Sequence, residues 1–240
     1  MRVFADIHIH ILPGVDDGPQ TAQQMQKLLD SAYRDGTRVI CVTPHFHPGM
    51  FGDNIKASAE GFRILSEYAG EKYPDLKLVQ GNELRYSPNC IEWLNQSYCR
   101  TMNGTNYVLV DFSEHVNKNI ITDAVHRLLN SGYRPILAHV ERYRNLSGNL
   151  RDLIRCKESG ALLQVDGPSL FGGWGLFAKN RSRKIIAHRL ADLVCSDAHN
   201  VTSRPPQLFP AFAYIQKRCG ETYAVEVLYE NALRLLNIQI

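Results

Sequence analysis

The sequence predicts an α/β fold in which parallel strands and helices alternate around a barrel. The first observation is the alternation itself, because short runs of apolar and β-branched residues are followed by longer stretches with helical spacing. The second is that the connections are short and no low-complexity linker divides the chain. Alternation with short connections is typical of a parallel sheet, and seven such units in 240 residues favour a barrel over an open sheet. We therefore expect a single TIM-like (β/α)7 domain over residues 1–240.

Seven short segments have the composition of buried strands, and longer amphipathic segments lie between them. We expect strands at Val3–Ile7, Arg38–Val42, Leu76–Gln80, Tyr107–Val110, Pro135–Ala138, Ala161–Val165 and Leu193–Cys195. We expect helices near residues 20–35, 54–73, 88–97, 119–131, 149–159 and 175–190, and two more after about residue 205.

Local signals mark several of the helix ends. Gly36, Gly132 and Gly160 each follow a helical stretch, where a left-handed C-terminal cap suits glycine. Thr21 and Gln24 have the spacing of a capping box at the start of the first helix. These signals support the helix boundaries that the periodicity indicates.

The composition is that of an ordinary folded protein and excludes several other classes. The chain carries 27 Lys and Arg against 24 Asp and Glu, which leaves a net charge of +3, and 44% of its residues are hydrophobic. These values exclude a disordered tail, a coiled coil and a collagen-like repeat. A protein dedicated to nucleic acid needs a stronger basic stripe, so we expect no nucleic-acid partner.

Neither a membrane span nor a disulfide framework is indicated. The longest apolar runs are only a few residues, so we expect no membrane insertion, and Val3–Ile7 has a strand pattern rather than that of a signal-peptide core. The six cysteines are scattered without a C-x-x-C pair, and Cys41 and Cys195 lie inside apolar runs as buried thiols would. We expect a cytoplasmic protein with reduced cysteines.

Titratable side chains follow six of the seven expected strands. The carboxyl ends of barrel strands lie on one rim, where such folds build their active sites. The residues concerned, in chain order, are His8, His10, His45, His47, Glu83, Asp111, His139, Glu141, Arg142, Asp197 and His199. Scattered polar residues would not keep to one end of every strand, so the pattern indicates a functional rim.

Imidazole and carboxylate groups together indicate a hydrolytic metal site. They suit Zn, Mn or Fe, whereas a structural zinc site is usually rich in cysteine. His8 and His10 lie two residues apart on extended chain, so both point to one face and can bind one ion. A carboxylate such as Glu83 can bridge two ions, and clustered divalent ions assist displacement at a phosphoryl group.

Each of these residues also has a simpler interpretation. A lone histidine at a strand end is often a loop or capping residue, and Glu83 or Asp111 alone would be a solvated rim charge. The shared rim favours the metal site for the set as a whole. His47 is either a ligand or a substrate contact, and we rank His45 above it because His45 is nearer the strand end. The three remaining histidines, His115, His126 and His188, are left outside the set.

Two arginines near the same rim suggest an anionic substrate. Arg142 follows His139 by three residues, and Arg204 precedes Pro205–Pro206 just after the Asp197 segment. Guanidinium groups match phosphate oxygens bidentately, so we assign both arginines to phosphate binding. Cysteine-based phosphatase chemistry is excluded, since no cysteine has an arginine six positions later, and neither a P-loop nor a G-x-S-x-G elbow occurs.

Taken together, these motifs resemble the polymerase and histidinol phosphatase (PHP) family. Within it, the chain is most similar to the bacterial manganese-dependent tyrosine-protein phosphatases of capsule and exopolysaccharide operons. The resemblance runs nearly end to end and rests on His8–Gly18, Thr43-Pro44-His45, Gly49-Met50-Phe51, Gly81-Asn82-Glu83, Ala138–Tyr143, Ser196–Asn200 and Arg204-Pro205-Pro206.

The resemblance implies a distorted β/α barrel of the PHP fold with a cluster of two to three divalent ions. Mn is the implied metal, with Zn, Fe or Mg as alternatives. The implied ligands are His8, His10, Asp17, His45, Glu83, Asp111, His139, Asp197 and His199. Asp17 lies on a long loop away from any strand end, so only the resemblance selects it. Relatives commonly carry Glu where this chain has Asp111, which makes that ligand the least secure.

The implied activity is hydrolysis of phosphotyrosine by a metal-dependent protein-tyrosine phosphatase. Arg142 and Arg204 match the phosphate-binding arginines of the family. The implied partner is a bacterial tyrosine autokinase that controls capsular or exopolysaccharide synthesis. The alternative is a phosphoesterase that acts on a small ester such as histidinol phosphate, or on a nucleic-acid end. A non-catalytic, metal-stabilised module that docks on a kinase is a third hypothesis.

Overall fold

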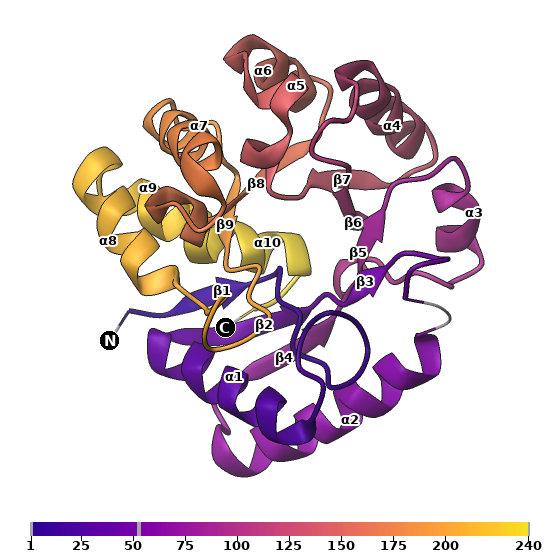
Figure 1. Cartoon of the computed structure of the whole chain (residues 1–240), viewed down its shortest axis with the longest axis vertical. Coiled ribbons are helices and arrows are strands. Elements are labelled where there is room, and N and C mark those ends of the chain that lie inside the picture. Colours follow the sequence, from indigo (N-terminus) through magenta and orange to yellow (C-terminus); the bar gives the residue numbers. More distant parts are fainter. Residues whose placement is uncertain (1, 52–53, 240) are drawn as a thin grey trace.

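A curled sheet of parallel strands lies at the centre of the molecule, and helices surround it (Figure 1). The computed structural model describes residues 2–51 and 54–239. The strands within these ranges are β1 (Phe4–Asp6), β2 (Thr37–Val42), β3 (His45–Phe46), β4 (Lys77–Gln80), β5 (Glu83–Arg85), β6 (Tyr107–Asp111), β7 (Arg134–Leu137), β8 (Leu162–Asp166) and β9 (Leu193–Cys195).

Neighbouring strands pair in parallel throughout the described residues. One sheet has the order β1-β2-β4, and the other has the order β3-β5-β6-β7-β8-β9. A parallel bridge between Ile9 and Ala198 joins the segments that follow β1 and β9, which are the first and last strands of the chain. The strands therefore curl round so that the two ends of the series meet.

Most helices follow one another around the sheet in chain order, and the last one lies near the centre (Figure 1). They are α1 (Ala22–Asp35), α2 (Ile55–Lys72), α3 (Cys90–Asn95), α4 (Lys118–Asn130), α5 (Arg144–Ser147), α6 (Leu150–Glu158), α7 (Gly175–Ala187), α8 (Leu208–Cys219), α9 (Glu221–Val225) and α10 (Asn231–Leu236). A π-helical turn, η4 (Glu226–Glu230), joins α9 to α10 without a break. In the described ranges, no helix is both long enough and apolar enough to cross a bilayer.

All seven expected strands are present, and the α/β class is confirmed. The sequence pattern did not predict β3 and β5, which are two and three residues long and begin three residues after β2 and β4 end. They are too short to show an alternating pattern. The expected helices are also present, whereas the four-residue α5 was not expected.

The helix-end signals that the sequence carries are found in the structure. Gly36 has a φ of 109° and its N–H donates to the carbonyls of Ala32 and Tyr33 at the end of α1. Thr21 and Gln24 form the expected capping box at its start. Gly132 and Gly160, with φ of 87° and 107°, likewise follow α4 and α6.

The interior of the curled sheet is filled by apolar side chains from the strands and from the last helix. Strand residues such as Ile136 and Leu193 pack in one cluster with Leu235 and Leu236 of α10. The Nδ2 of Asn103, which precedes β6, donates to the carbonyl of Leu236 (2.8 Å). The C-terminal segment therefore closes the interior at the amino ends of the strands and leaves their carboxyl ends for the site. Cys41 and Cys195 are buried in this same cluster, and all six cysteines are free.

Candidate metal centre

The segment after β1 carries two histidines to the carboxyl edge of the sheet. Its backbone is tied to the segment after β9, because the N–H of His10 donates to the carbonyl of Ala198 (2.9 Å) and the N–H of Asp197 donates to that of His8 (2.8 Å). Side chains alternate along extended chain, so Ile9 packs into the core between α1 and α2 while His8 and His10 share the opposite face. This pairing brings residues from the two ends of the strand series together.

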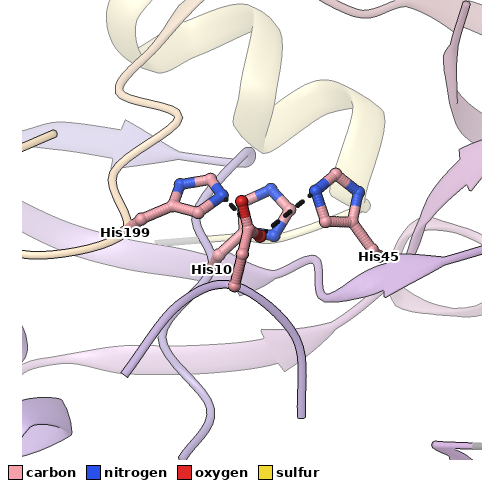
Figure 2. Close-up of side chains that lie close together, drawn as sticks. His10, His45 and His199 are labelled. Atoms are coloured by element: carbon pink, nitrogen blue, oxygen red, sulfur yellow. Dashed lines mark ion pairs between the residues drawn. The ribbon is translucent and has the colours of Figure 1, made fainter. Parts of the chain in front are cut away.

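A first group of potential ligand atoms comes from His10, Asp17, His45 and His199, all within 4.8 Å of one another. Figure 2 shows the three imidazole rings grouped together, each on a different segment of the chain. The Oδ1 of Asp17 lies 3.4 Å from Nε2 of His45 and 3.1 Å from Nε2 of His199. Asp17 thus belongs with the histidines, as the resemblance implies, although its own side chain is half exposed.

Two further groups lie deeper and share members with the first. His8, His10 and Asp197 form one, and His8, Glu83 and His139 form the other. The Oε1 of Glu83 is 3.3 Å from Nε2 of His8 and 3.0 Å from Nε2 of His139, and its Oε2 is 3.3 Å from Nε2 of His10. Glu83 therefore lies between histidines of different groups, which is the position that a bridging carboxylate needs.

The two central carboxyl groups are held in their ionised form. Burial raises the pKa of Glu83, but the nearby His8 and His45 outweigh burial and leave that pKa well below its usual value. Burial likewise raises the pKa of Asp197, and Arg142 and His8 bring it well below the usual range. The centre thus offers anionic oxygens beside imidazole nitrogens, which is the donor set of a divalent metal site.

Neighbouring polar residues fix which ring nitrogen faces the centre. The Oδ2 of Asp16 lies 2.8 Å from Nδ1 of His10, and the Oε1 of Gln164 lies 3.1 Å from Nδ1 of His8. The backbone N–H of His139 also donates to Gln164 (2.7 Å). Both Nε2 atoms are thereby directed at the carboxylates, as partners of metal-binding histidines commonly do. The sequence pattern assigned no role to either residue, although Asp16 lies within the His8–Gly18 motif, and Gln164 carries no local signal.

Several buried atoms of the centre make no aligned hydrogen bond among the residues that the structure describes. Nδ1 of His139 is one of them, and Oε2 of Glu83 and Nε2 of His199 have only ion-pair neighbours, which are His10 (3.3 Å) and His45 (2.8 Å) for Glu83 and Asp17 (3.1 Å) for His199. A buried polar atom without a partner costs about 1–3 kcal/mol, and a bound cation offsets that cost for a carboxylate or imidazole acceptor. The side chains that are present therefore fit divalent ions.

Asp111 lies at the edge of the centre and belongs to none of the three groups found in the described residues. Its Oδ1 is 3.6 Å from Nε2 of His139, and its Oδ2 accepts from the guanidinium of Arg85. Arg85 also donates to Oγ of Ser113 (2.6 Å). Arg85 was missed in the sequence, although its position two residues after Glu83 on β5 places both side chains on one face.

The two predicted phosphate-binding arginines lie side by side above the centre. Arg142 pairs through one terminal nitrogen with Asp166 and Asp197. Arg204 pairs with Asp17 (3.2 Å) and with the same Asp197 oxygen (3.0 Å). The Nε–H of each arginine is buried and has no partner in the described part of the chain. Asp166 was missed, although it directly follows the one expected strand to which no rim residue was assigned.

These side chains open into a cavity of about 420 Å³. Its polar part contains Glu83, His139 and Asp197 together with both arginines. Aromatic side chains form another part of the wall, and they are Phe112, Tyr143, Trp174 and Phe177. The cavity therefore has two arginines and several candidate metal ligands at its floor and aromatic rings along one side.

The remaining histidines lie outside the centre. His47 is in none of the groups found among residues 2–51 and 54–239, and its ring faces Phe51 at 6.5 Å between centroids. His115, His126 and His188 are exposed and, within the described part of the chain, belong to none of the three groups.

A parallel α/β sheet with buried histidines and carboxylates at its carboxyl edge is typical of metal-dependent hydrolases. Residues 4–237 match the family model described as capsular polysaccharide synthesis, CpsB/CapC. The chain belongs to this family, and the resemblance to bacterial tyrosine-protein phosphatases that the motifs indicate is confirmed.

Curated relatives match along nearly the whole chain. The tyrosine-protein phosphatase CpsB of Streptococcus pneumoniae is 33% identical over 240 residues, which cover 98% of this chain and 99% of the relative. The tyrosine-protein phosphatase YwqE of Bacillus subtilis is 32% identical over 235 residues, which cover 98% of this chain and 92% of the relative.

A solved structure also matches closely. It is described among crystal structures of YwqE from Bacillus subtilis and CpsB from Streptococcus pneumoniae, unique metal-dependent tyrosine phosphatases. The TM-score is 0.89 at 30% identity, with 100% of this chain and 96% of that chain covered. The phosphotriesterase homology protein of Escherichia coli, with a TM-score of 0.61 at 11% identity, shares the fold alone.

Proposed function

We propose that this chain is a metal-dependent protein-tyrosine phosphatase that hydrolyses phosphotyrosine in proteins. The relatives that match along the full chain carry the name tyrosine-protein phosphatase. The solved structure that matches along the whole chain is described as a metal-dependent tyrosine phosphatase. The cavity adds the chemistry, since an anion-binding arginine pair faces a cluster of metal-ligating side chains.

The observation that carries the proposal is the unpaired, buried Nε–H of Arg142 and of Arg204, in the part of the chain that the structure describes. Each keeps a buried Nε–H that has no partner among the described residues, while its terminal nitrogens bind carboxylates. A buried donor without an acceptor is costly, and phosphate oxygens supply acceptors that match guanidinium geometry. Arg142 and Arg204 would therefore bind the phosphoryl group and stabilise the charge that develops on it.

Divalent ions bound at this centre would supply Lewis-acid activation of the phosphoryl group and of water. His8, His10, Asp17, His45, Glu83, His139, Asp197 and His199 would hold them, with Asp111 as a further candidate. We propose two to three ions, with Mn as the native metal. Asp197 would couple the two functions, because one of its oxygens pairs with both arginines while the other faces His8 and His10.

We also propose that the sheet is a distorted barrel of seven strand–helix units in one domain over residues 1–240. We count β2 and β3 as one strand that is interrupted at Thr43–Pro44. We likewise count β4 and β5 as one strand that is interrupted at Gly81–Asn82. Hydrogen bonds from the N–H of Gly81 to Val42 (2.9 Å) and of Glu83 to Pro44 (3.1 Å) continue the pairing across both interruptions. Counted in this way, the strands number seven in the described residues.

The proposed physiological substrate is the phosphotyrosine-containing part of a bacterial tyrosine autokinase in the cytoplasm. Control of capsular or exopolysaccharide synthesis would then be the biological role. The family description and the aromatic side of the cavity support this proposal.

Hydrolysis of three substrates by one preparation tests the proposed function. The protein is stripped with a chelator, reloaded separately with Mn, Zn, Fe or Mg, and assayed on a phosphotyrosine peptide, histidinol phosphate and a single-stranded oligonucleotide. We expect the peptide to be the preferred substrate and Mn to restore the most activity. Activity that survives complete metal removal, or a preference for histidinol phosphate, would contradict the proposal.

A further inference from the structure

Trp174 contacts both arginines of the cavity. The Cζ of Arg142 lies 3.6 Å from the centre of the Trp174 ring, and the Cζ of Arg204 lies 4.8 Å from it. Guanidinium groups within about 6 Å of an aromatic ring are attracted to its face, and tryptophan is the strongest partner. Trp174 also lines the cavity and stays 38% exposed, so it forms part of the wall that a ligand meets.

The backbone around Trp174 is shaped by glycines. Gly172 and Gly175 have φ of 99° and 82°, in the left-handed region that favours glycine. A Cβ on Gly173 would lie 3.2 Å from both the Cβ and the carbonyl oxygen of Pro168. The segment between η3 (Gly167–Phe171) and α7 therefore takes a compact path, which brings the indole over the arginines.

The ion pairs alone do not determine how Arg142 is oriented. Both of its carboxylate partners, Asp166 and Asp197, accept from the same terminal nitrogen. A planar group held at one atom can still rotate about that contact, which would swing its Nε–H away from the cavity. Contact with the flat ring of Trp174 opposes this rotation, and the same ring limits the movement of Arg204.

We propose that Trp174 is a positioning residue that orients Arg142 and Arg204 for phosphate binding. The inference rests on the proposed function, because it assumes that phosphate esters bind at these arginines. Loss of the ring would leave the metal ligands in place and weaken the arginine contacts to the phosphate oxygens.

The test compares Trp174→Leu with Trp174→Phe in the metal-loaded full-length protein. Calorimetric titration with inorganic phosphate and steady-state kinetics on a phosphotyrosine peptide are the two measurements. Loss of about 1–2 kcal/mol of cation–π attraction corresponds to roughly a 5- to 30-fold weaker phosphate affinity and a similar rise in KM for Trp174→Leu. We expect Trp174→Phe to retain most of the affinity, since it keeps an aromatic face. Leu176→Ala, two residues along the chain and 75% exposed, is the control and should match the wild type.

A spectroscopic measurement separates positioning from a general structural effect. The chain has two tryptophans, so Trp93→Phe leaves Trp174 as the only one. We expect saturating phosphate to change its fluorescence, because the ligand alters the charges against the ring. Unchanged phosphate affinity in Trp174→Leu, equal losses in the Leu and Phe variants, or loss of bound metal in Trp174→Leu would each overturn the inference. A wild-type protein that binds phosphate yet does not hydrolyse phosphotyrosine would contradict the proposed function and leave the inference standing.

Discussion

The orientation of the histidines in the centre depends on residues that are not themselves candidate ligands. Asp16 faces Nδ1 of His10, and it also accepts from the backbone N–H of His45 (2.9 Å). One carboxylate thus positions two histidines of the first group. The contact with Asp16 holds the proton of His10 on Nδ1 (2.8 Å), so the lone pair of Nε2 is left free for a metal.

Asp16→Ala tests this role at the level of one residue. Loss of such a supporting partner commonly lowers metal affinity by about 10- to 100-fold, and we expect a loss in that range. Competition with a fluorescent chelator gives the affinity, and elemental analysis gives the metal content after dialysis. The exposed Asp123→Ala on α4 is the matched control and should bind metal as the wild type does. Wild-type affinity in Asp16→Ala would show that His10 needs no such support.

The sequence pattern could predict the site residues that directly follow strands. It could not predict residues whose role depends on contacts with segments far away in the sequence. His8, Glu83, His139 and Asp197 were predictable, because the carboxyl ends of parallel strands share a rim. Gln164 was not, because it sits inside a strand and reaches His8 only through tertiary pairing, 156 residues away in sequence. Asp166 carried the same strand-end signal as the others. Trp174 had no signal, since its role comes from contacts with two arginines on other loops.

At the scale of elements, the junction between α1 and β2 depends on a backbone conformation that glycine adopts. Gly36 has a φ of 109°, and a Cβ there would lie 2.8 Å from the carbonyl oxygen of Arg2 and 3.0 Å from the ring of Phe4. A Cβ at Gly70, in α2, would meet no atom within 4 Å among its described neighbours outside the helix's own backbone. The same substitution should therefore have opposite effects at the two sites.

Gly36→Ala should destabilise the protein by roughly 1–3 kcal/mol, because alanine disfavours positive φ and meets the Arg2 backbone. Gly70→Ala should stabilise it by about 0.5–1 kcal/mol, since alanine has the higher helix propensity. Urea unfolding of both variants, with unchanged m-values, gives the comparison. Equal effects at the two positions would refute the assignment of the left-handed cap.

The elements that the sequence predicts well are those with a clear period or a terminal signal. The strands Thr37–Val42 and Tyr107–Asp111 are apolar runs of ordinary length, and α1 carries a signal at both ends. The strand His45–Phe46 forms only because parallel pairing with Glu83–Leu84 continues past Pro44, which local sequence does not encode. The formation of such short strands depends on pairing with the adjacent strand and not on their own sequence.

At the scale of the whole molecule, Asp35 links the first helix to the C-terminal helices. It accepts from the N–H of Leu208 (2.6 Å) and of Phe209 (3.2 Å) at the start of α8. Burial raises its pKa to about 6, against a usual value near 3.8, in spite of these hydrogen bonds. The folded protein therefore holds a proton at Asp35 more tightly than the unfolded chain does.

This shift gives a pH dependence of stability with a defined sign. An acid whose folded-state pKa is raised contributes stability that is full below the unfolded pKa and is lost as pH rises through the folded value. The free energy of unfolding of the wild type, measured relative to Asp35→Asn, should therefore fall between about pH 4 and pH 6 and level off above it. Urea titrations of both proteins in chelator across this range provide the measurement. A difference that stays constant with pH would mean that Asp35 keeps its ordinary pKa.

Because α10 closes the interior, the core of the molecule can be covered only late in synthesis, after the candidate ligands have been made. The chain emerges from its amino terminus, so His8 and His10 are made early, His199 much later, and Leu235 and Leu236 after His199. Until those leucines are in place, the apolar inner faces of the strands stay open at their amino ends. The helix α10 thus covers the core only after all the candidate ligands have been made, and a chain released between His199 and α10 would carry those ligands while the amino ends of its strands stayed uncovered.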